Sequence, residues 1–306
     1  MKITFCCTGT KPEPWLAGLR AAFPGAEVGV WEPGAPVADQ AVVWAPPQQF
    51  FDEQTELKGV FNIGAGVDAL LKLRLPPQAT VVRLDDAGMS VQMAEYVCHA
   101  VIRHFREFDG YAADIQAGKW TYRKPLERSE FPVGVMGLGV LGARVAQSVA
   151  QFDFPIVGWS RSAKELAGVR CFAGAAQFND FLASTRILVN LLPLTPETRD
   201  IMCLQTLSRL RSGGYVINVA RGAHLVDEDL LALLASGHLA GAMLDVFRTE
   251  PLPPEHPFWQ HPQITITPHT SARTLRDESI AQIAGKIRAL EAGQAIVGIV
   301  DPVRGY

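Results

Sequence analysis

A glycine-rich turn between two apolar segments constrains the fold of this chain more than any other feature. The segment 133–136, VGVM, is short and apolar, as expected of a strand buried on both faces. Gly137, Gly139 and Gly142 follow it at G-x-G-x-x-G spacing. In such a turn the first glycine allows a tight bend, the second lets the backbone approach a pyrophosphate, and the third lets the next helix pack closely. The pattern predicts a dinucleotide-binding site.

The residues after these glycines provide the surroundings that the motif requires. Apolar residues recur at helical spacing at Leu141, Val145, Val149 and Phe152, which predicts a helix whose first N–H groups face a phosphate. A second strand is predicted over 156–160. A structural turn without a ligand is the alternative interpretation, but the order strand, turn, helix, strand favours the ligand site.

The end of the second predicted strand indicates which dinucleotide is bound. A free ribose 2′-hydroxyl is recognised by a carboxylate about 20 residues beyond the glycines, whereas a 2′-phosphate is recognised by an arginine. Here the strand ends in Ser160, Arg161 and Ser162, Lys164 follows, and no Asp or Glu occupies the strand end. A planar guanidinium and two hydroxyls suit a dianionic phosphate. The sequence therefore predicts NADPH in preference to NADH, with a solvated basic loop as the alternative.

The composition limits the class of protein. At 306 residues the chain is long enough for two domains, and a net charge of -3 indicates neither nucleic-acid binding nor a membrane surface. The opening residues MKITFCCTGT become polar after Cys7, so we expect no signal peptide, and no apolar run reaches transmembrane length. The 5 cysteines show no C-x-x-C pattern. We therefore expect thiols in a reducing, cytoplasmic compartment and no metal site.

Strand and helix patterns alternate along the chain, which predicts an α/β fold with parallel sheets. The predicted strands are residues 2–7, 27–31, 40–45, 59–63, 79–84, 133–136, 156–160, 186–192, 215–220, 240–246 and 264–267. The predicted helices are residues 14–23, a long helix from Ser90, 109–118, the helix after the glycines, 177–183, 204–211, 227–236 and 275–292. The polar stretch 120–130 is the best candidate for a linker.

Three polar residues follow strands of the second half. Arg221 comes after YVINVA, Glu250 lies just beyond Asp245 at the end of GAMLD, and His269 comes after ITITP. Ligands of a doubly wound sheet bind outside the carboxyl ends of its strands, so these residues are expected near a bound dinucleotide. Each residue taken alone also has a structural explanation, as a surface ion-pair partner, a solvated loop acid or a helix cap. Their joint placement favours a site.

Reduction of a 2-oxo acid is the chemistry that needs these three residue types beside a nicotinamide. Hydride adds to the carbonyl carbon, negative charge grows on the oxygen, and a proton must arrive. Histidine is the natural proton donor at neutral pH. Glu250 beside His269 would favour the imidazolium form and orient the ring. The Arg221 guanidinium matches a carboxylate and can also lie against the carbonyl oxygen.

The chain resembles the D-2-hydroxyacid dehydrogenase family, most closely its glyoxylate/hydroxypyruvate reductase A branch. The resemblance covers nearly the whole chain, and its motifs agree in order and spacing. These motifs are GAGVD (64–68), GLGVLG (137–142), LLPLTPET (191–198), NVARG (218–222), DEDLLALLASG (227–237), LDVFRTEPLP (244–253) and ITPHTSA (266–272).

The resemblance implies roles for individual residues. Arg221, Glu250 and His269 match the catalytic residues of the family. The residues that match its cofactor site are Gly137, Gly139, Val140, Leu141, Gly142, Ser160, Arg161, Ser162, Leu192, Pro193, Thr198, Val219, Ala220 and Asp245, the last beside the nicotinamide carboxamide. The substrate-binding residues are Trp44, Arg221 and the carboxylate clamp Ala65, Gly66 and Val67, with Arg83 as a further pocket residue. From sequence alone the clamp loop is explained equally well as a simple turn.

The resemblance also implies the domain organisation and the activity. It implies two Rossmann-like or flavodoxin-like domains with the active site in the cleft between them. Residues 1–97 and 276–306 are expected to form the substrate-binding domain, and 98–275 the NADP-binding domain. The expected activity is NADPH-dependent reduction of glyoxylate and hydroxypyruvate by a homodimer. The alternatives are a dehydrogenase of a larger 2-oxo acid and a non-catalytic NAD(P)-sensing protein, while formate oxidation fits the residues less well because it needs no proton donor.

Overall fold

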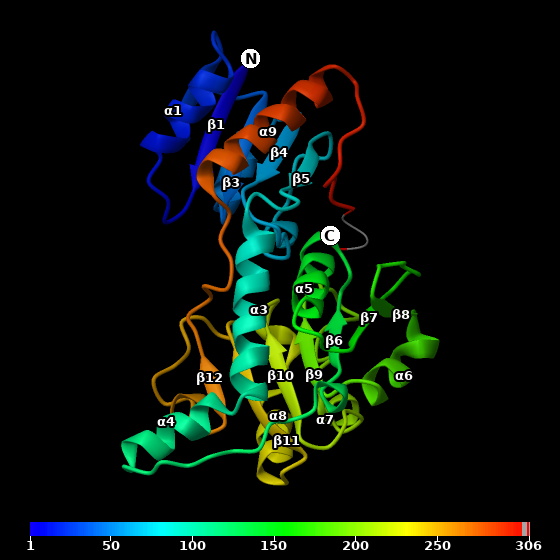
Figure 1. Cartoon of the computed structure of the whole chain (residues 1–306). Helices are drawn as coiled ribbons and strands as arrows, with labels where there is room; N and C mark the ends of the chain where they lie inside the picture. Colours follow the sequence, from blue (N-terminus) through cyan, green and yellow to red (C-terminus); the bar gives the residue numbers. More distant parts are fainter. Residues whose placement is uncertain (302–304, 306) are drawn as a thin grey trace. The chain divides into compact units, whose positions relative to one another are not determined.

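The computed structural model describes residues 1–301 and 305, and the chain divides into two compact units (Figure 1). Unit 1 comprises Met1–Met89 and Arg273–Tyr306, and unit 2 comprises Ser90–Ala272. The chain therefore leaves unit 1 after its fifth strand and returns to it through the last helix. Each unit is a parallel α/β structure, which confirms the fold class predicted from the sequence.

Unit 1 contains a five-stranded sheet in the order β2-β1-β3-β4-β5, with every pairing parallel. Helices lie on both faces, and α1 and α9 pack together on one of them (Figure 1). The side chains of β1 alternate between the two core clusters, with Ile3 and Phe5 on the α1–α9 face and Cys6 on the other. The elements are β1 Lys2–Cys7, α1 Glu13–Ala22, β2 Glu27–Val30, β3 Gln40–Trp44, α2 Gln48–Glu53, β4 Gly59–Asn62, β5 Thr80–Arg83 and α9 Arg276–Glu291.

Unit 2 contains a seven-stranded sheet in the order β12-β11-β10-β9-β6-β7-β8, again with every pairing parallel. The strands are β6 Val133–Met136, β7 Ile156–Ser160, β8 Val169–Ala173, β9 Ile187–Asn190, β10 Gly214–Asn218, β11 Leu239–Leu244 and β12 Ile264–Ile266. The helices are α3 Met89–Phe105, α4 Phe108–Gln116, α5 Val140–Ala150, α6 Phe178–Ala183, α7 Leu204–Leu207 and α8 Asp227–Ala235.

The order of the strands in unit 2 reverses between β6 and β9. From β6 the chain builds outward through β7 and β8, and it then returns to the other side of β6 to place β9, β10, β11 and β12 in succession. The last residues of the central strands are in register, since Met136 pairs with Asn190 and Asn190 pairs with Asn218. The carboxyl ends beside this switch point are the expected position of a ligand in such a sheet.

Several local predictions were wrong. The structure has a strand, β8, and a helix, α2, that the sequence pattern did not indicate, because β8 is a partly exposed edge strand and α2 has only 6 residues. The helix predicted over 204–211 ends at Leu207. Phe152, predicted on the buried face of the helix after the glycines, lies beyond the end of α5 and is 42% exposed. The remaining predicted strands and helices are present, with ends that differ by a few residues.

Among the residues described, no helix is both long enough and apolar enough to cross a lipid bilayer.

Candidate active site

The glycine turn between β6 and α5 is closely packed on one side and open at its middle glycine. A Cβ on Gly137, whose φ is 98°, would lie 2.8 Å from the Leu191 carbonyl oxygen, and one on Gly142 would lie 1.7 Å from the Gly137 carbonyl oxygen. A Cβ on Gly139 would meet nothing within 4 Å. The first intrahelical hydrogen bond of α5 runs from the Ala143 N–H to the Gly139 carbonyl. The N–H groups of the first turn have no partner within the helix, so they suit an anion.

The end of β7 forms an ordered basic turn. The Ser160 side chain is buried and donates to the Ser162 carbonyl at 2.7 Å, while Arg161 and Ser162 are exposed. The pKa of Glu197 is lowered by hydrogen bonds from Thr195 and from its own backbone, and the positive charge of Arg161 adds to this effect. The turn that the sequence assigns to a 2′-phosphate thus places its guanidinium where it influences the loop after β9.

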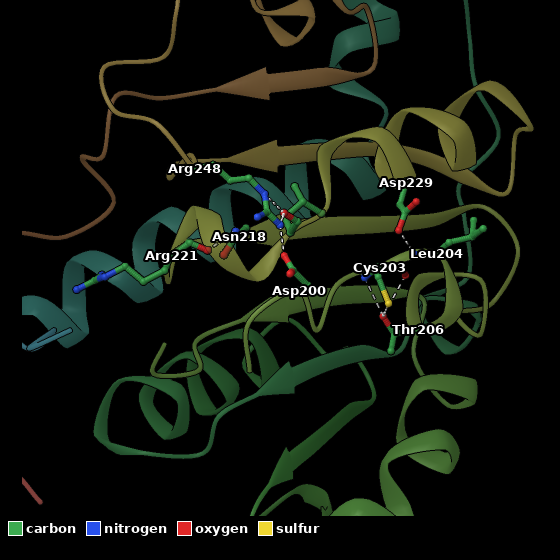
Figure 2. Close-up of polar contacts among 9 residues, drawn as sticks. Asp200, Cys203, Leu204, Thr206, Asn218, Arg221, Asp229 and Arg248 are labelled. Atoms are coloured by element: carbon green, nitrogen blue, oxygen red, sulfur yellow. Dashed lines mark hydrogen bonds and ion pairs between the residues drawn. The ribbon is translucent and has the colours of Figure 1, made fainter. Parts of the chain in front are cut away.

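Two asparagines at the ends of β9 and β10 hold the loops that follow these strands. The Asn190 amide nitrogen donates to the Asn218 side-chain oxygen at 3.0 Å, and both residues are fully buried. The Asn190 oxygen accepts from the Leu192 N–H at 3.2 Å. The Asn218 amide nitrogen donates to the Arg221 carbonyl at 3.0 Å, as Figure 2 shows. Each asparagine side chain therefore holds the backbone that follows its own strand, and the two side chains are hydrogen-bonded to each other.

Buried His224 extends this network to the loop expected to line the cofactor. The Asn190 amide nitrogen lies 2.9 Å from His224 Nδ1, and His224 Nε2 lies 3.3 Å from the Pro193 carbonyl oxygen. Because the Asn190 oxygen already accepts from a backbone N–H, its nitrogen is the donor to Nδ1, so Nε2 carries the hydrogen for Pro193. The Thr198 hydroxyl donates to the same carbonyl at 2.7 Å. The loop containing Leu192, Pro193 and Thr198 is thus tied to the strand ends.

Arg221 begins the turn after β10, and its side chain is half-buried. Its Nη1 donates to the Ala220 carbonyl at 2.7 Å, next to the buried Val219. In Figure 2 its guanidinium extends away from Arg248 and Asp200. Arg248 pairs with Asp200 and donates from Nε to the Leu225 carbonyl at 2.7 Å. Arg248 thereby links the loop before Glu250 to Asp200 and to Leu225, the residue after His224.

Glu250 and His269 are in direct contact. His269 Nδ1 lies 2.7 Å from Glu250 Oε2, and the other carboxylate oxygen accepts from the Phe247 N–H at 2.9 Å. Partial burial opposes ionisation of Glu250. The hydrogen bonds from His269 and Phe247, with the positive charges of His269 and Arg221, outweigh that burial and hold the pKa of Glu250 below its ordinary value. Arg221 thus acts on the same carboxylate that contacts His269.

Asp245 is fully buried at the end of β11 and holds the turn that carries His269. Its carboxylate accepts from the Thr267 hydroxyl at 2.5 Å and from the N–H groups of Thr270 and Ser271, each at 2.8 Å. Its backbone carbonyl accepts from the His269 N–H at 2.9 Å. His269 has φ = 53°, a left-handed conformation that is uncommon for residues with a side chain. The contact of Asp245 with a nicotinamide remains a prediction.

The loop after β4 in unit 1 has a geometry suited to an anion. The Asn62 amide nitrogen donates to the carbonyls of Gly64 and Gly66, each at 3.0 Å. Because a trans peptide points its N–H opposite its C=O, the N–H groups of Ala65 and Val67 point away from Asn62. Trp44 packs against this loop, since a Cβ on Gly64 would lie 2.4 Å from its ring.

Arg83, predicted as a further pocket residue, also belongs to unit 1, as does Met89. The Arg83 backbone is tied to Gly298 and Lys286, and the Met89 side chain is buried. Within the described residues no group of three or more His, Cys, Asp or Glu side chains is arranged to hold a metal ion.

The structure adds residues that the sequence analysis did not select. These are Asn62, Asn190, Asn218, His224, Arg248 and Thr267. For the three asparagines a signal was present, because each is the last residue of an apolar strand and a buried amide there requires partners. His224 and Arg248 had no such signal, since their partners lie far away in the sequence.

Comparison with known proteins places the chain in a family. Residues 98–271 match the family model for the D-isomer specific 2-hydroxyacid dehydrogenase NAD binding domain. The chain is 48% identical to a glyoxylate/hydroxypyruvate reductase A of Serratia proteamaculans, with 100% of both chains covered.

Two solved structures are similar over nearly their whole length. A D-isomer specific 2-hydroxyacid dehydrogenase from Xanthobacter autotrophicus Py2, in complex with NADPH and MES, is 40% identical with a TM-score of 0.95. An NADPH-dependent glyoxylate/hydroxypyruvate reductase from Sinorhizobium meliloti, in complex with NADP and sulfate, is 36% identical with a TM-score of 0.93. Each alignment covers 100% of this chain and 99% of the other. The chain therefore belongs to the D-isomer specific 2-hydroxyacid dehydrogenase family.

Proposed function

We propose that this protein is an NADPH-dependent reductase that converts glyoxylate to glycolate and hydroxypyruvate to glycerate. The contact of 2.7 Å between His269 Nδ1 and Glu250 Oε2 is the observation that carries the proposal, because it equips a dinucleotide fold with an oriented proton donor. The names of the relatives from Serratia proteamaculans and Sinorhizobium meliloti support the choice of substrates. The enzyme class is that of an oxidoreductase acting on 2-hydroxy acids.

The chemistry assigns one step to each group. NADPH, when bound, supplies the hydride that adds to the carbonyl carbon of the 2-oxo acid. His269 gives a proton from Nε2 to the carbonyl oxygen, since its Nδ1 is engaged by Glu250. Glu250 favours the charged imidazolium before the transfer and keeps the ring oriented. Arg221 places a permanent positive charge near the growing negative charge and offers a fork to the substrate carboxylate.

NADP is the cofactor class that the chain's own residues fit. The glycine turn leaves open space at Gly139 beside the first N–H groups of α5, which have no partner within the helix, and this suits a pyrophosphate. Ser160, Arg161 and Ser162 end β7 without a carboxylate, so a 2′-phosphate meets a cation there and no acid of this strand end. Leu192, Pro193, Thr198, Val219 and Ala220 belong to the loops that would line the remainder of the cofactor. Structures of the relatives with NADPH or NADP agree with this choice.

The substrate carboxylate is assigned to the loop after β4. The N–H groups of Ala65 and Val67 point away from Asn62, and Gly66 lies between the two residues. These N–H groups would donate hydrogen bonds to the two carboxylate oxygens of the substrate. Trp44, which is 38% exposed and packs on Gly64, would set the size of the accepted side chain. As part of the proposal, residues 1–97 and 276–306 bind the substrate and 98–275 bind NADP.

The proposal includes a homodimer in the cytoplasm. An apolar surface, the α4 patch, is formed by Phe108 and Ile115 on α4 and by Trp120 and Tyr122 after it. Ile115 is 75% exposed, Tyr122 81% and Trp120 fully, which is unusual for such side chains unless a partner covers them. The 5 cysteines are unpaired, which suits a reducing compartment. Light scattering should give twice the monomer mass, and Trp120→Asp should lower it.

The decisive experiment measures the fall of nicotinamide absorbance when the purified protein is mixed with NADPH and a panel of 2-oxo acids. Glyoxylate and hydroxypyruvate should be reduced with a higher kcat/KM than pyruvate or branched 2-oxo acids. Preference for a larger acid would identify a different dehydrogenase of the same family. NADPH binding without turnover of any acid would indicate a dinucleotide-sensing protein and would contradict the proposal.

A further inference from the structure

We infer that Tyr96, on α3, is a positioning residue that acts through Thr267 and Asp245 on the turn carrying His269. The inference rests on the proposed role of His269 as the proton donor. It concerns a residue far from the three strand-end groups in the sequence, connected to them by a line of hydrogen bonds within unit 2.

The direction of these hydrogen bonds follows from the number of hydrogens. The Tyr96 hydroxyl lies 2.6 Å from the Thr267 hydroxyl, which in turn lies 2.5 Å from Asp245 Oδ1. Thr267 has one hydroxyl hydrogen and gives it to the carboxylate, so Tyr96 donates to Thr267. Burial raises the pKa of Tyr96 to about 12, so the phenol retains its proton in the neutral range. The line therefore runs in one direction, from Tyr96 through Thr267 to Asp245.

Asp245 connects these hydrogen bonds to the backbone of the turn that carries His269. The same Oδ1 accepts from the Thr270 N–H, and Oδ2 accepts from the Ser271 N–H. These two N–H groups belong to the residues directly after His269, and the His269 N–H itself donates to the Asp245 carbonyl. Rotation of the carboxylate would release the turn at both oxygens. The Thr267 hydroxyl opposes that rotation only while its own rotamer is fixed, and Tyr96 fixes it.

Tyr96 is itself held rigidly. Its neighbours Met93, Val97 and Ala100 on α3 are buried in a core cluster that includes residues of the sheet, so the helix cannot shift without disturbing that packing. The side chain has two rotatable bonds and is half-buried against the same cluster. The Tyr96 hydroxyl, held by a packed helix, thus orients the turn at His269, where φ is positive.

The test is a double-mutant cycle of Tyr96→Phe and Thr267→Val, read as the rate of NADPH oxidation in a single turnover with saturating glyoxylate. Tyr96→Phe removes one hydroxyl and should slow the reaction roughly threefold to tenfold, the effect of one lost hydrogen bond. Thr267→Val should slow it more, because Asp245 then loses a donor. In the Thr267→Val background, Tyr96→Phe should have no further effect.

Controls separate positioning from a general loss of structure. The Tyr96→Phe effect should return in full in a Thr267→Ser background, which keeps the hydroxyl, while the KM for NADPH and the melting temperature stay near wild type. Tyr111→Phe on α4, whose ring lies 5.1 Å from the Arg123 guanidinium, should leave the rate unchanged. If Thr267→Val does not fold, Thr267→Ala takes its place in the cycle.

Three outcomes would overturn the inference: an unchanged rate in Tyr96→Phe, additive effects in the cycle, or a rate loss matched by a lower melting temperature and a higher KM for NADPH. None of these would affect the proposed function, which depends on His269. Conversely, full activity of a His269→Asn variant would remove the proposed role of His269, whatever the outcome of the cycle.

Discussion

Glu250 contacts both the ring of His269 and the backbone of its own loop, with one carboxylate oxygen 2.7 Å from His269 Nδ1 and the other 2.9 Å from the Phe247 nitrogen. The carboxylate is therefore hydrogen-bonded at both oxygens, and this arrangement orients the imidazole ring. In the proposed mechanism, His269 held in this way transfers the proton from Nε2. The predictions below follow from this pair and from the turns that support it.

Replacing Glu250 by Gln should change the pH dependence of reduction. The pKa of Glu250 lies below its ordinary value, so its negative charge is present throughout the neutral range and is lost only as the pH falls through that lowered pKa. Removing the carboxylate removes a negative charge beside the proposed proton donor, so the alkaline fall in kcat/KM should move to lower pH. An exposed acid, Glu255→Gln, serves as the control. An unmoved alkaline limb would mean that Glu250 does not act on the donor.

Replacing Arg161 by Ala should reduce the preference for NADPH. The guanidinium at the end of β7 is assigned to the 2′-phosphate, so its loss should raise the KM for NADPH at least tenfold, or by about 1.4 kcal/mol, and leave the KM for NADH nearly unchanged. Arg209→Ala, at an exposed position of the same unit, removes the same charge and should change neither value. The measurement is the ratio of kcat/KM for the two cofactors. Equal losses with both cofactors would remove Arg161 from phosphate recognition.

Replacing Gly222 by Ala should impair both stability and activity. A Cβ at this position would lie 1.9 Å from the Phe247 carbonyl carbon, so the turn that carries Arg221 and the loop that carries Glu250 would have to separate. Overpacking of this kind costs about 1–3 kcal/mol of unfolding free energy, and kcat should fall with it. Gly285→Ala in α9, where a Cβ meets nothing within 4 Å, should instead be neutral or stabilising. Denaturant unfolding and steady-state kinetics of both variants check this. Wild-type kcat in the Gly222 variant would show that the close approach is dispensable.

The sequence was sufficient for the features that depend on local patterns. The G-x-G-x-x-G turn and the apolar strands of unit 2 were predicted because spacing and hydrophobic runs define them. The proximity of Glu250 and His269 was predicted because consecutive strands of a parallel sheet end at one edge. The edge strand β8 was missed because only one of its residues is fully buried, so its sequence lacks an apolar run.

The supporting residues were not predictable in the same way. Tyr96 and Thr267 are 171 positions apart, and Asn190 and His224 are 34 apart, so no local pattern relates the members of either pair. Buried polar groups require partners, but the sequence does not say which partner each one finds. The function of the strand-end groups could be inferred from their chemistry. The residues that hold these groups in place could be identified only from the three-dimensional structure.

The most direct test of His269 as the proton donor in an NADPH-dependent reductase compares the wild-type protein with His269→Asn in two assays. Wild type should oxidise NADPH when glyoxylate is added. The variant should lose about 10²–10⁴-fold in kcat, the usual contribution of a general acid, while its Kd for NADPH, measured by fluorescence, stays within a factor of about two. Wild-type kcat in the variant, or no glyoxylate-dependent oxidation by the unmodified protein, would contradict the proposed function.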